Sequence, residues 1–250
     1  MMKIEKIKKQ KSGKYILEMD DNSKLQLYED VILNNGLLFK KEIDSELFNK
    51  LNLENNYYEV YNKVLKFISN KMRSEVEINK YLDRIECIEK DKIISKLKSM
   101  NLINDDLYLK AFINDKICLS LVGPNKIKKE LLEHNIELDK IDEELVKYEN
   151  MFPERINKII SKKIKTNNRS IYMFKQKMIN ELIESGYNKE DILNELEKYT
   201  FDESKNIKKD YDVIYKKLSK KYKDEELKNQ IKNKLFNKGY NYENIKEIVK

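Results

Sequence analysis

The stretch MINELIESGYNKEDILNEL (Met178–Leu196) returns with the same spacing as IKNKLFNKGYNYENIKEIV (Ile231–Val249). A third copy, IKKELLEHNIELDKIDEEL, occupies Ile127–Leu145. Each copy has an apolar residue first, Leu four residues later, Gly or Asn ninth, an aromatic residue or Ile tenth, and Ile fifteenth. Because the whole pattern recurs in phase, chance in a biased composition does not explain the shared GYN, and the pattern indicates a repeated structural unit.

The middle of each copy is predicted to be a helix end. Gly or Asn takes the left-handed position after the helix, and the next apolar residue covers the last turn. A second helix then begins over the polar residues that follow. A fourth copy, INKYLDRIECIEKDKIISKL (Ile78–Leu97), fits when one residue is inserted between Asp83 and Ile93.

Each copy also follows a segment whose apolar residues recur at helical intervals. The unit is therefore predicted to contain three helices in about 50 residues. Helices this short are not stable alone, so neighbouring units must stack and bury a shared core. The preceding helices are expected over Tyr57–Met72, Asp105–Leu121, Phe152–Ile164 and Tyr211–Tyr222.

The first 45 residues have a different pattern. Lys14–Tyr28 alternates apolar and polar residues on both sides of DDNS, which predicts a β-hairpin, and Glu29–Leu37 reads as a short helix ended by Gly36. The segment Asp44–Asn55 is expected to lead into the helical array. We predict a mainly α protein of tandem three-helix repeats that form a curved, elongated array with a small N-terminal β-containing extension. The predicted ranges are 1–55 for the extension and 56–104, 105–150, 151–203 and 204–250 for the repeats.

Composition narrows the possible functions. The chain of 250 residues has a formal net charge of +7, two Cys without a CxxC partner, and one His. These counts argue against zinc sites and histidine-based catalytic triads. No apolar run reaches the roughly 18 residues of a membrane span, and MMKIEKIKKQ at the N-terminus does not read as a signal peptide. A cytoplasmic protein with reduced cysteines is expected.

Four short motifs lie between Ser74 and Ile136 in a characteristic order and spacing. They are Ser74, Glu77 and Ile78; then Ile103, Asn104, Asp105 and Tyr108; then Gly123 and Pro124; then Ile127, Glu130 and Leu131. In this order they resemble the RecX family of bacterial recombination regulators. Asn104, Leu109 and Asn135 depart from the family pattern, which has Asp, a small residue and Gly at those places.

The resemblance implies tandem three-helix modules without a catalytic site. It also implies binding to the RecA recombinase, chiefly along the groove of its filament on DNA, with modulation of strand exchange and ATP hydrolysis. The expected effect is inhibition, in homologous recombination and DNA repair. No enzyme activity, metal or cofactor is expected, and the protein is expected to be a monomer that does not bind membranes.

The same motifs have a physical interpretation of their own. Asn104 or Asp105 can cap the helix that follows, which would place Tyr108 on its inward face. Gly123–Pro124 reads as a turn and a first helical position rather than a phosphate cradle, because no GK[ST] follows. Both motifs are therefore interpreted as architecture.

Charge is distributed unevenly within the repeats: each opens basic and closes acidic. Arg155–Asn180 contains eight basic residues and no acid, whereas Glu181–Glu203 carries eight acids against two lysines. One interpretation is ion pairing between acidic third helices and basic first helices. The other is a basic surface that meets a nucleic-acid backbone or an acidic protein groove.

The candidate partner-binding residues follow from the second interpretation. The leading partner is the recombinase filament; the alternative is DNA, single- or double-stranded, bound directly by the basic opening helices. Tyr172, Tyr187 and Tyr240 are expected in the core or over helix ends rather than as stacking platforms. The candidate residues are Lys66, Lys71, Arg73, Arg155, Lys158, Lys162, Lys163, Lys165, Arg169, Lys175, Lys177, Lys216, Lys217, Lys220 and Lys221.

Overall fold

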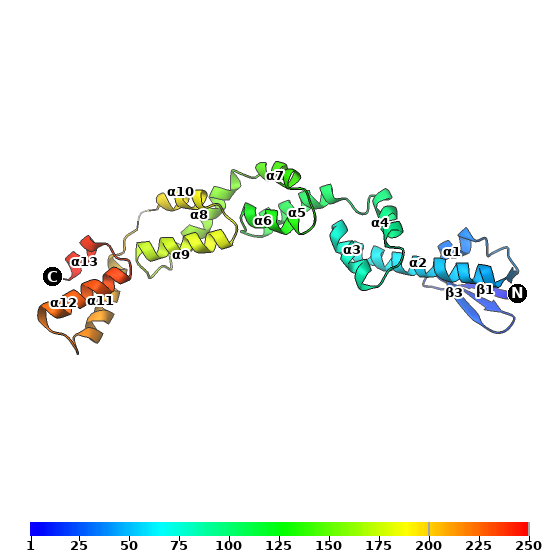
Figure 1. The fold of residues 1–250 in the computed structure, drawn as a ribbon, viewed down its shortest axis with the longest axis horizontal. Coiled ribbons are helices and arrows are strands. Elements are labelled where there is room, and N and C mark those ends of the chain that lie inside the picture. Colours follow the sequence, from blue (N-terminus) through cyan, green and yellow to red (C-terminus); the bar gives the residue numbers. More distant parts are fainter. Residues whose placement is uncertain (200, 250) are drawn as a thin grey trace. The chain divides into compact units, whose positions relative to one another are not determined.

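Helices dominate the computed structural model, which describes residues 1–199 and 201–249. Thirteen helices and a small N-terminal sheet lie in these residues, which confirms the predicted mainly α repeat fold (Figure 1). Packing groups the chain into two units, Met1–Tyr108 and Leu109–Lys250, here called unit 1 and unit 2.

Unit 1 begins with a four-stranded antiparallel sheet of order β3-β2-β1-β4. The predicted hairpin is β2 and β3, with Leu17 opposite Leu25. Strands β1 and β4 were not predicted. In β1 the register shifts between Ile4 and Lys6, and this irregularity breaks the alternation that would have marked the strand in the sequence. The bounds are Met2–Lys9 for β1, Tyr15–Met19 for β2, Lys24–Leu27 for β3 and Glu42–Ile43 for β4.

Two helices pack against this sheet. Helix α1 (Glu29–Asn34) ends as predicted, with Gly36 at φ +61°. Helix α2 (Ser45–Ser69) begins twelve residues before the predicted Tyr57, because the Asp44 carboxylate caps it by accepting the Leu47 N–H at 2.7 Å. Its residues Leu51 and Tyr58 join side chains from the strands in the core of unit 1.

From α2 onward the helices follow in sets of three. The first set is α2, α3 and α4 in unit 1, and three further sets run from α5 to α13. The division into four modules with the predicted ranges stays a prediction, since packing alone separates only two units. The bounds are α3 Glu75–Arg84, α4 Lys90–Ser99, α5 Asp105–Leu119, α6 Pro124–Leu132, α7 Leu138–Val146, α8 Met151–Ile164, α9 Ile171–Glu184, α10 Lys189–Glu197, α11 Ser204–Leu218, α12 Asp224–Asn237 and α13 Tyr242–Ile248.

The second helix of every set ends in the same corner, as the repeat predicted. The ninth residue of each copy has positive φ, from +52° to +91°, and the tenth residue donates its N–H to the carbonyl five residues earlier. The ninth residues are Glu86, Asn135, Gly186 and Gly239. The corresponding hydrogen bonds are Cys87 to Leu82, Ile136 to Leu131, Tyr187 to Leu182 and Tyr240 to Leu235.

Glu86 is a residue with a Cβ in this left-handed position, at φ +52°. Replacing it with Gly is expected to raise the free energy of unfolding by about 0.5–1 kcal/mol, because steric strain is relieved and only part of the gain is lost to chain entropy. Urea unfolding of the full chain measures the change. Asn135→Gly is the control and should give a smaller gain, because Asn tolerates this conformation. A less stable E86G variant would contradict the interpretation.

The motifs between the first two sets cap helices. Ser74 and Glu77 form a capping box at the start of α3. The Asn104 Oδ1 accepts the Leu107 N–H at 3.0 Å, and Tyr108 is buried, as expected. Asp105 has a role that was not predicted. Its Oδ1 accepts the Glu75 N–H at 3.0 Å, so a residue 30 positions further along the chain stabilises the start of α3.

In unit 2 the second helices meet end to end. The Gly123 N–H at the start of α6 donates to the Ser185 carbonyl at the end of α9, at 2.7 Å, and the Asn125 N–H donates to the Gly186 carbonyl at 2.9 Å (Figure 1). In the same way the Ser170 hydroxyl at the start of α9 donates to the Lys238 carbonyl after α12. Groups that helix ends leave without partners are thus satisfied by the next helix, which explains why the corner is the most repeated part of the sequence.

Candidate functional site

The candidate residues of unit 1 are largely engaged by the protein itself. Lys71 and Arg73 both lie beside the Glu77 carboxylate, at 3.4 and 3.1 Å. The Arg73 guanidinium also covers the Phe67 ring, 4.0 Å from its centroid. Burial would raise the pKa of Glu77, but the Ser74 N–H and the two cations outweigh it, and the pKa is lowered. Lys66 is exposed on α2.

The Arg155 side chain is buried and bonded within the fold, and it is not part of the surface. The residue lies on α8 and is 8% exposed. The guanidinium donates to the Ile117 carbonyl at 2.6 Å and to the Ser120 and Val122 carbonyls, so it closes the C-terminal end of α5. We therefore leave Arg155 out of the proposed binding surface.

The end of α8 and the loop after it present free positive charge. Lys158, Lys162, Lys165 and Arg169, here called the α8–α9 basic segment, are exposed and form no ion pair with any residue in the ranges 1–199 and 201–249. The loop is held in place by Asn167, whose Oδ1 accepts the Arg169 N–H at 3.1 Å and whose Nδ2 donates to the Arg169 carbonyl.

Three other candidates on α8 and α9 have partners. Lys163 pairs with Glu181, and Lys177 lies 3.5 Å from the same carboxylate. The hydrogen bond from Lys163 is the largest cause that lowers the pKa of Glu181. Lys175 is half-buried, with its Nζ 5.8 Å from the centroid of the Phe201 ring.

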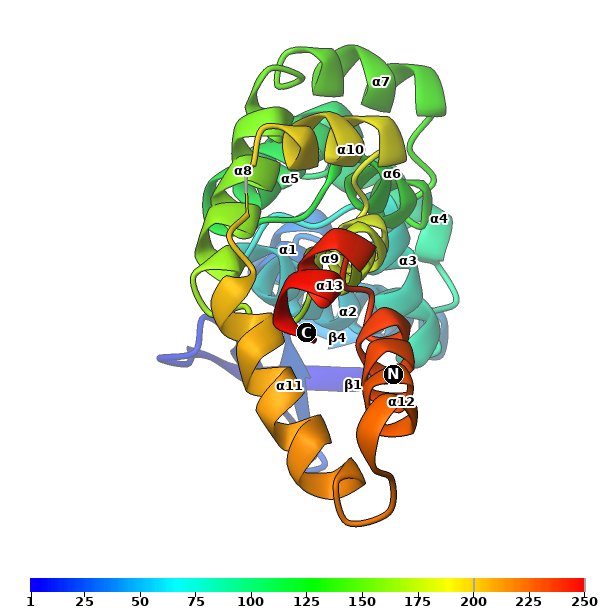
Figure 2. The ribbon, with the colours of Figure 1, turned by 90° about the vertical axis from the view of Figure 1, so that its left-hand side faces the viewer.

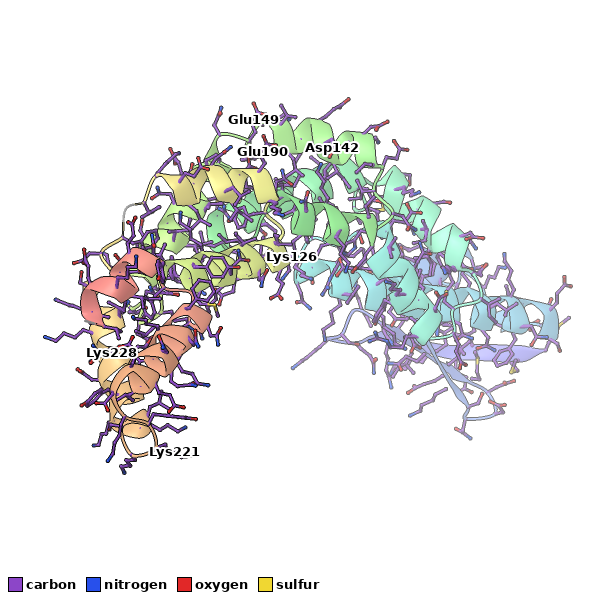
Figure 3. The ribbon with its side chains drawn as sticks, turned by 60° about the vertical axis from the view of Figure 1, so that its left-hand side comes forward. Lys126, Asp142, Glu149, Glu190, Lys221 and Lys228 are labelled. Atoms are coloured by element: carbon purple, nitrogen blue, oxygen red, sulfur yellow. The ribbon has the colours of Figure 1, made fainter. Side chains whose placement is uncertain are left out.

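Helix α11 and the turn after it carry a second basic surface. Lys216, Lys217, Lys220 and Lys221 are all exposed, and the described residues offer them no carboxylate within ion-pair distance. Figure 3 shows Lys221 at the end of unit 2 formed by α11 and α12.

Acidic residues gather elsewhere in unit 2. The third helices α7 and α10 form one edge of this part (Figure 2). Asp142, Glu149 and Glu190 lie along that edge, whereas Lys126 lies on the opposite side (Figure 3). Second helices, or the residues directly after them, take part in ion pairs with other helices of this unit, as in Lys128 with Asp142 and Lys238 with Asp210. In the part of the chain that the structure describes, no ion pair joins a base on a first helix to an acid on a third helix. This favours separate basic and acidic surfaces over pairing between those helices.

Two features at the contact between α9 and α12 were not predicted from the sequence. One is an aromatic groove lined by Tyr172 and Phe236, and the other is a basic hollow that includes Lys209. Tyr187 and Tyr240 are buried as expected, whereas Tyr172 is 58% exposed and its ring lies beside Gly239, over the end of α12. It lines a groove of about 650 Å³ together with Phe236. Lys209 on α11 shares a second hollow, of about 350 Å³, with Arg169. Only the apolar content of FNKGY and the position of Lys209 in a lysine-rich helix pointed to them in the sequence.

Within residues 1–199 and 201–249, no cluster of three or more His, Cys, Asp or Glu side chains is arranged to hold a metal ion. Over the same ranges, none of the helices combines the length and the apolar character that a membrane crossing requires.

Comparison with known proteins gives consistent relatives. The chain is 34% identical to "Regulatory protein RecX" of Streptococcus agalactiae, with 100% of this chain and 99% of the relative covered. It is 29% identical to the protein of the same name from Listeria welshimeri, with 98% and 95% covered. A crystal structure of a regulatory protein RecX matches 78% of this chain and all of that chain, with 25% identity and a TM-score of 0.66. The RecX structure from Lactobacillus salivarius shares the fold at a TM-score of 0.51 and 23% identity, over 56% of this chain and 94% of that one. No protein-family model matches the chain.

Proposed function

The chain belongs to the RecX family of regulatory proteins, and we propose that it regulates the RecA recombinase by binding the recombinase and its filament on DNA. In this proposal it lowers ATP hydrolysis and strand exchange in homologous recombination and DNA repair. It acts as a cytoplasmic monomer, without a cofactor and without catalysing a reaction of its own. The names of its relatives support a regulatory role.

The observation that carries the proposal is the α8–α9 basic segment. A positive surface that faces solvent without internal partners is suited to long-range attraction of a negatively charged assembly. The loop is ordered by Asn167 and Asn206, which both bond the Arg169 backbone, so little ordering entropy is lost on binding. By contrast, Arg73 and Lys163 are already neutralised within the fold.

Charge reversal of this segment is expected to weaken inhibition. In the triple variant Lys162→Glu, Lys165→Glu and Arg169→Glu, the concentration that halves RecA ATPase activity on single-stranded DNA should rise by about tenfold or more, because attraction becomes repulsion. Lys163 is left unchanged, since a Glu beside Glu181 would destabilise the fold itself. The measurement is a titration of the full chain at several salt concentrations.

A matched control separates the position of the charge from its amount. The triple variant Lys110→Glu, Lys126→Glu and Lys129→Glu makes the same change in net charge at exposed lysines of α5 and α6. It should inhibit nearly as well as the native protein. If both variants lose inhibition equally, the effect is one of overall charge and the proposed surface is wrong. If neither does while circular dichroism shows both folded, the recombinase is bound elsewhere or not at all.

A further inference from the structure

We propose that unit 2 also binds single-stranded nucleic acid directly, at the contact between the start of α9 and the end of α12. In this site a base stacks on Tyr172 and Phe236, and backbone phosphates lie against Arg169 and Lys209. The inference goes beyond binding of the recombinase and does not depend on it.

The first part of the site is an aromatic groove. Phe236 is 64% exposed and Tyr172 58%, and both line the same groove with Ile171 and Tyr240. Gly239 makes room for the Tyr172 ring, because a Cβ at that position would lie 2.9 Å from the ring atom Cδ1. Two large rings held at a solvent-exposed groove offer flat apolar faces, and base–aromatic stacking uses such faces whatever the base.

The second part is a cationic hollow. Arg169 and Lys209 line it together with Ser170 and Lys238. Lys238 is neutralised by Asp210 at 2.7 Å, whereas the described residues provide no ion-pair partner for Arg169 or Lys209. The start of α9 is already used, since the Ile171 N–H donates to the Glu203 carboxylate at 2.9 Å. The attraction for an anion therefore comes from the two side chains and not from the helix end.

The two parts flank one contact. The Ser170 hydroxyl donates to the Lys238 carbonyl, and each of these residues lines the cationic hollow. The residues that follow Ser170 and Lys238 in the sequence, Ile171 and Gly239, line the aromatic groove. A polynucleotide that crosses this contact can place a phosphate on one side and a base on the other.

Helix α11 extends the cationic track away from this contact. Three of its lysines, at intervals of four and seven residues, fall on one helical face and span about 16 Å along the axis. They are Lys205, Lys209 and Lys216, and Lys220 lies in the turn that follows the helix. A row of this kind follows a sugar–phosphate backbone, because it neutralises successive phosphates without reading their sequence.

The aromatic groove indicates which kind of anionic partner binds here: a duplex, an acidic protein surface or a single strand. In a duplex the base faces are already stacked on each other, so Tyr172 and Phe236 would gain no partner. An acidic protein surface would satisfy the lysines, but it does not join a planar ring to each negative charge as a polynucleotide does. A single strand supplies both the charge and the free base faces, so it is the occupant to which we commit.

The aromatic part is tested with a fluorescent dT oligonucleotide of about 16 nucleotides. Anisotropy is measured with the full chain and without recombinase. Tyr172→Ala and Phe236→Ala should each weaken binding by about tenfold, while Tyr172→Phe keeps the native affinity. Phe39→Ala, at an exposed ring of unit 1 that is 92% accessible, is the matched control and should have no effect. Native affinity in both alanine variants, or equal affinity for a duplex of the same length, would overturn the inference.

The cationic part is tested by salt dependence. For single strands the slope of log K against log salt is about −0.7 per phosphate contact, so the Arg169→Gln and Lys209→Gln double variant should reduce its magnitude by about 1.4. Lys126→Gln is the control and should leave the slope unchanged, and an unchanged slope in the double variant would remove these residues from the site.

A pull-down of the Y172A variant with recombinase, in the absence of DNA, tests the two proposals separately. Loss of oligonucleotide binding with retained recombinase binding supports the separate site, whereas a native protein that binds the oligonucleotide but not recombinase contradicts only the regulatory proposal.

Discussion

Replacing Gly186 with Ala is expected to lower the free energy of opening of unit 2 by about 3–5 kcal/mol. Two costs add at this residue. Its φ of +91° is a conformation that residues with a Cβ rarely adopt, and a Cβ there would lie 2.4 Å from the Lys126 backbone nitrogen. That atom belongs to α6 and is not the end of a flexible side chain, so the two second helices must separate. The hydrogen bonds from Gly123 and Asn125 would be lost with their contact.

Other glycines provide a graded set of controls. Gly36 has φ +61°, and a Cβ at this residue would have nothing within 4 Å. Gly36→Ala therefore measures the conformational cost alone, and it should lower the free energy of opening by about 1–2 kcal/mol. Gly239→Ala meets side-chain atoms of Tyr172 and Ser170 at 2.9 and 3.0 Å, which can move, so its effect should be intermediate. Hydrogen exchange followed by mass spectrometry reports each unit separately. If G186A costs no more than G36A, the close helix contact does not stabilise unit 2.

Local features of the fold could be predicted from the sequence, whereas contacts between repeats could not. Each copy of the repeat carries its own helix spacing and corner, so a local pattern was enough to predict the helices and the positive φ of Gly186. The close approach of Gly186 to Lys126 is a contact between repeats 60 residues apart, and no local pattern encodes it. The start of α2 was missed for a related reason, because a cap at Asp44 and 25 residues without Gly or Pro outweigh weak apolar periodicity.

For the candidate site the sequence predicted the amount of charge but not its availability. Acid-free runs were visible, and the α8–α9 basic segment lies in one of them. Whether a cation faces solvent depends on residues across the fold: Lys163 meets Glu181 of the next helix, and Arg73 lies over Phe67. The exposure of Tyr172 has the same origin, since its ring lies over the corner at Gly239 instead of entering the core.

Replacing Arg155 with Met is expected to lower the free energy of opening of unit 2 by about 3 kcal/mol. The buried guanidinium donates to carbonyls in the last turn of α5 and in the loop before α6, and Met would leave these carbonyls without a donor. Arg155→Lys keeps the charge but has no planar fork to reach several carbonyls at once, so it should recover only part of the stability. Hydrogen exchange at the end of α5 measures both effects.

Lys158→Met tests whether this loss belongs to the position or to any cation on α8. Lys158 is exposed three residues further along the helix, and its replacement should change stability by less than about 0.5 kcal/mol. The effects on inhibition of the recombinase should be the reverse of the effects on stability, because Lys158 belongs to the α8–α9 basic segment and Arg155 does not. At a temperature where R155M is still folded, it should inhibit the recombinase like the native protein, because its charge does not face a partner. An R155M protein of native stability that no longer inhibits would instead return Arg155 to the binding surface that its sequence position first suggested.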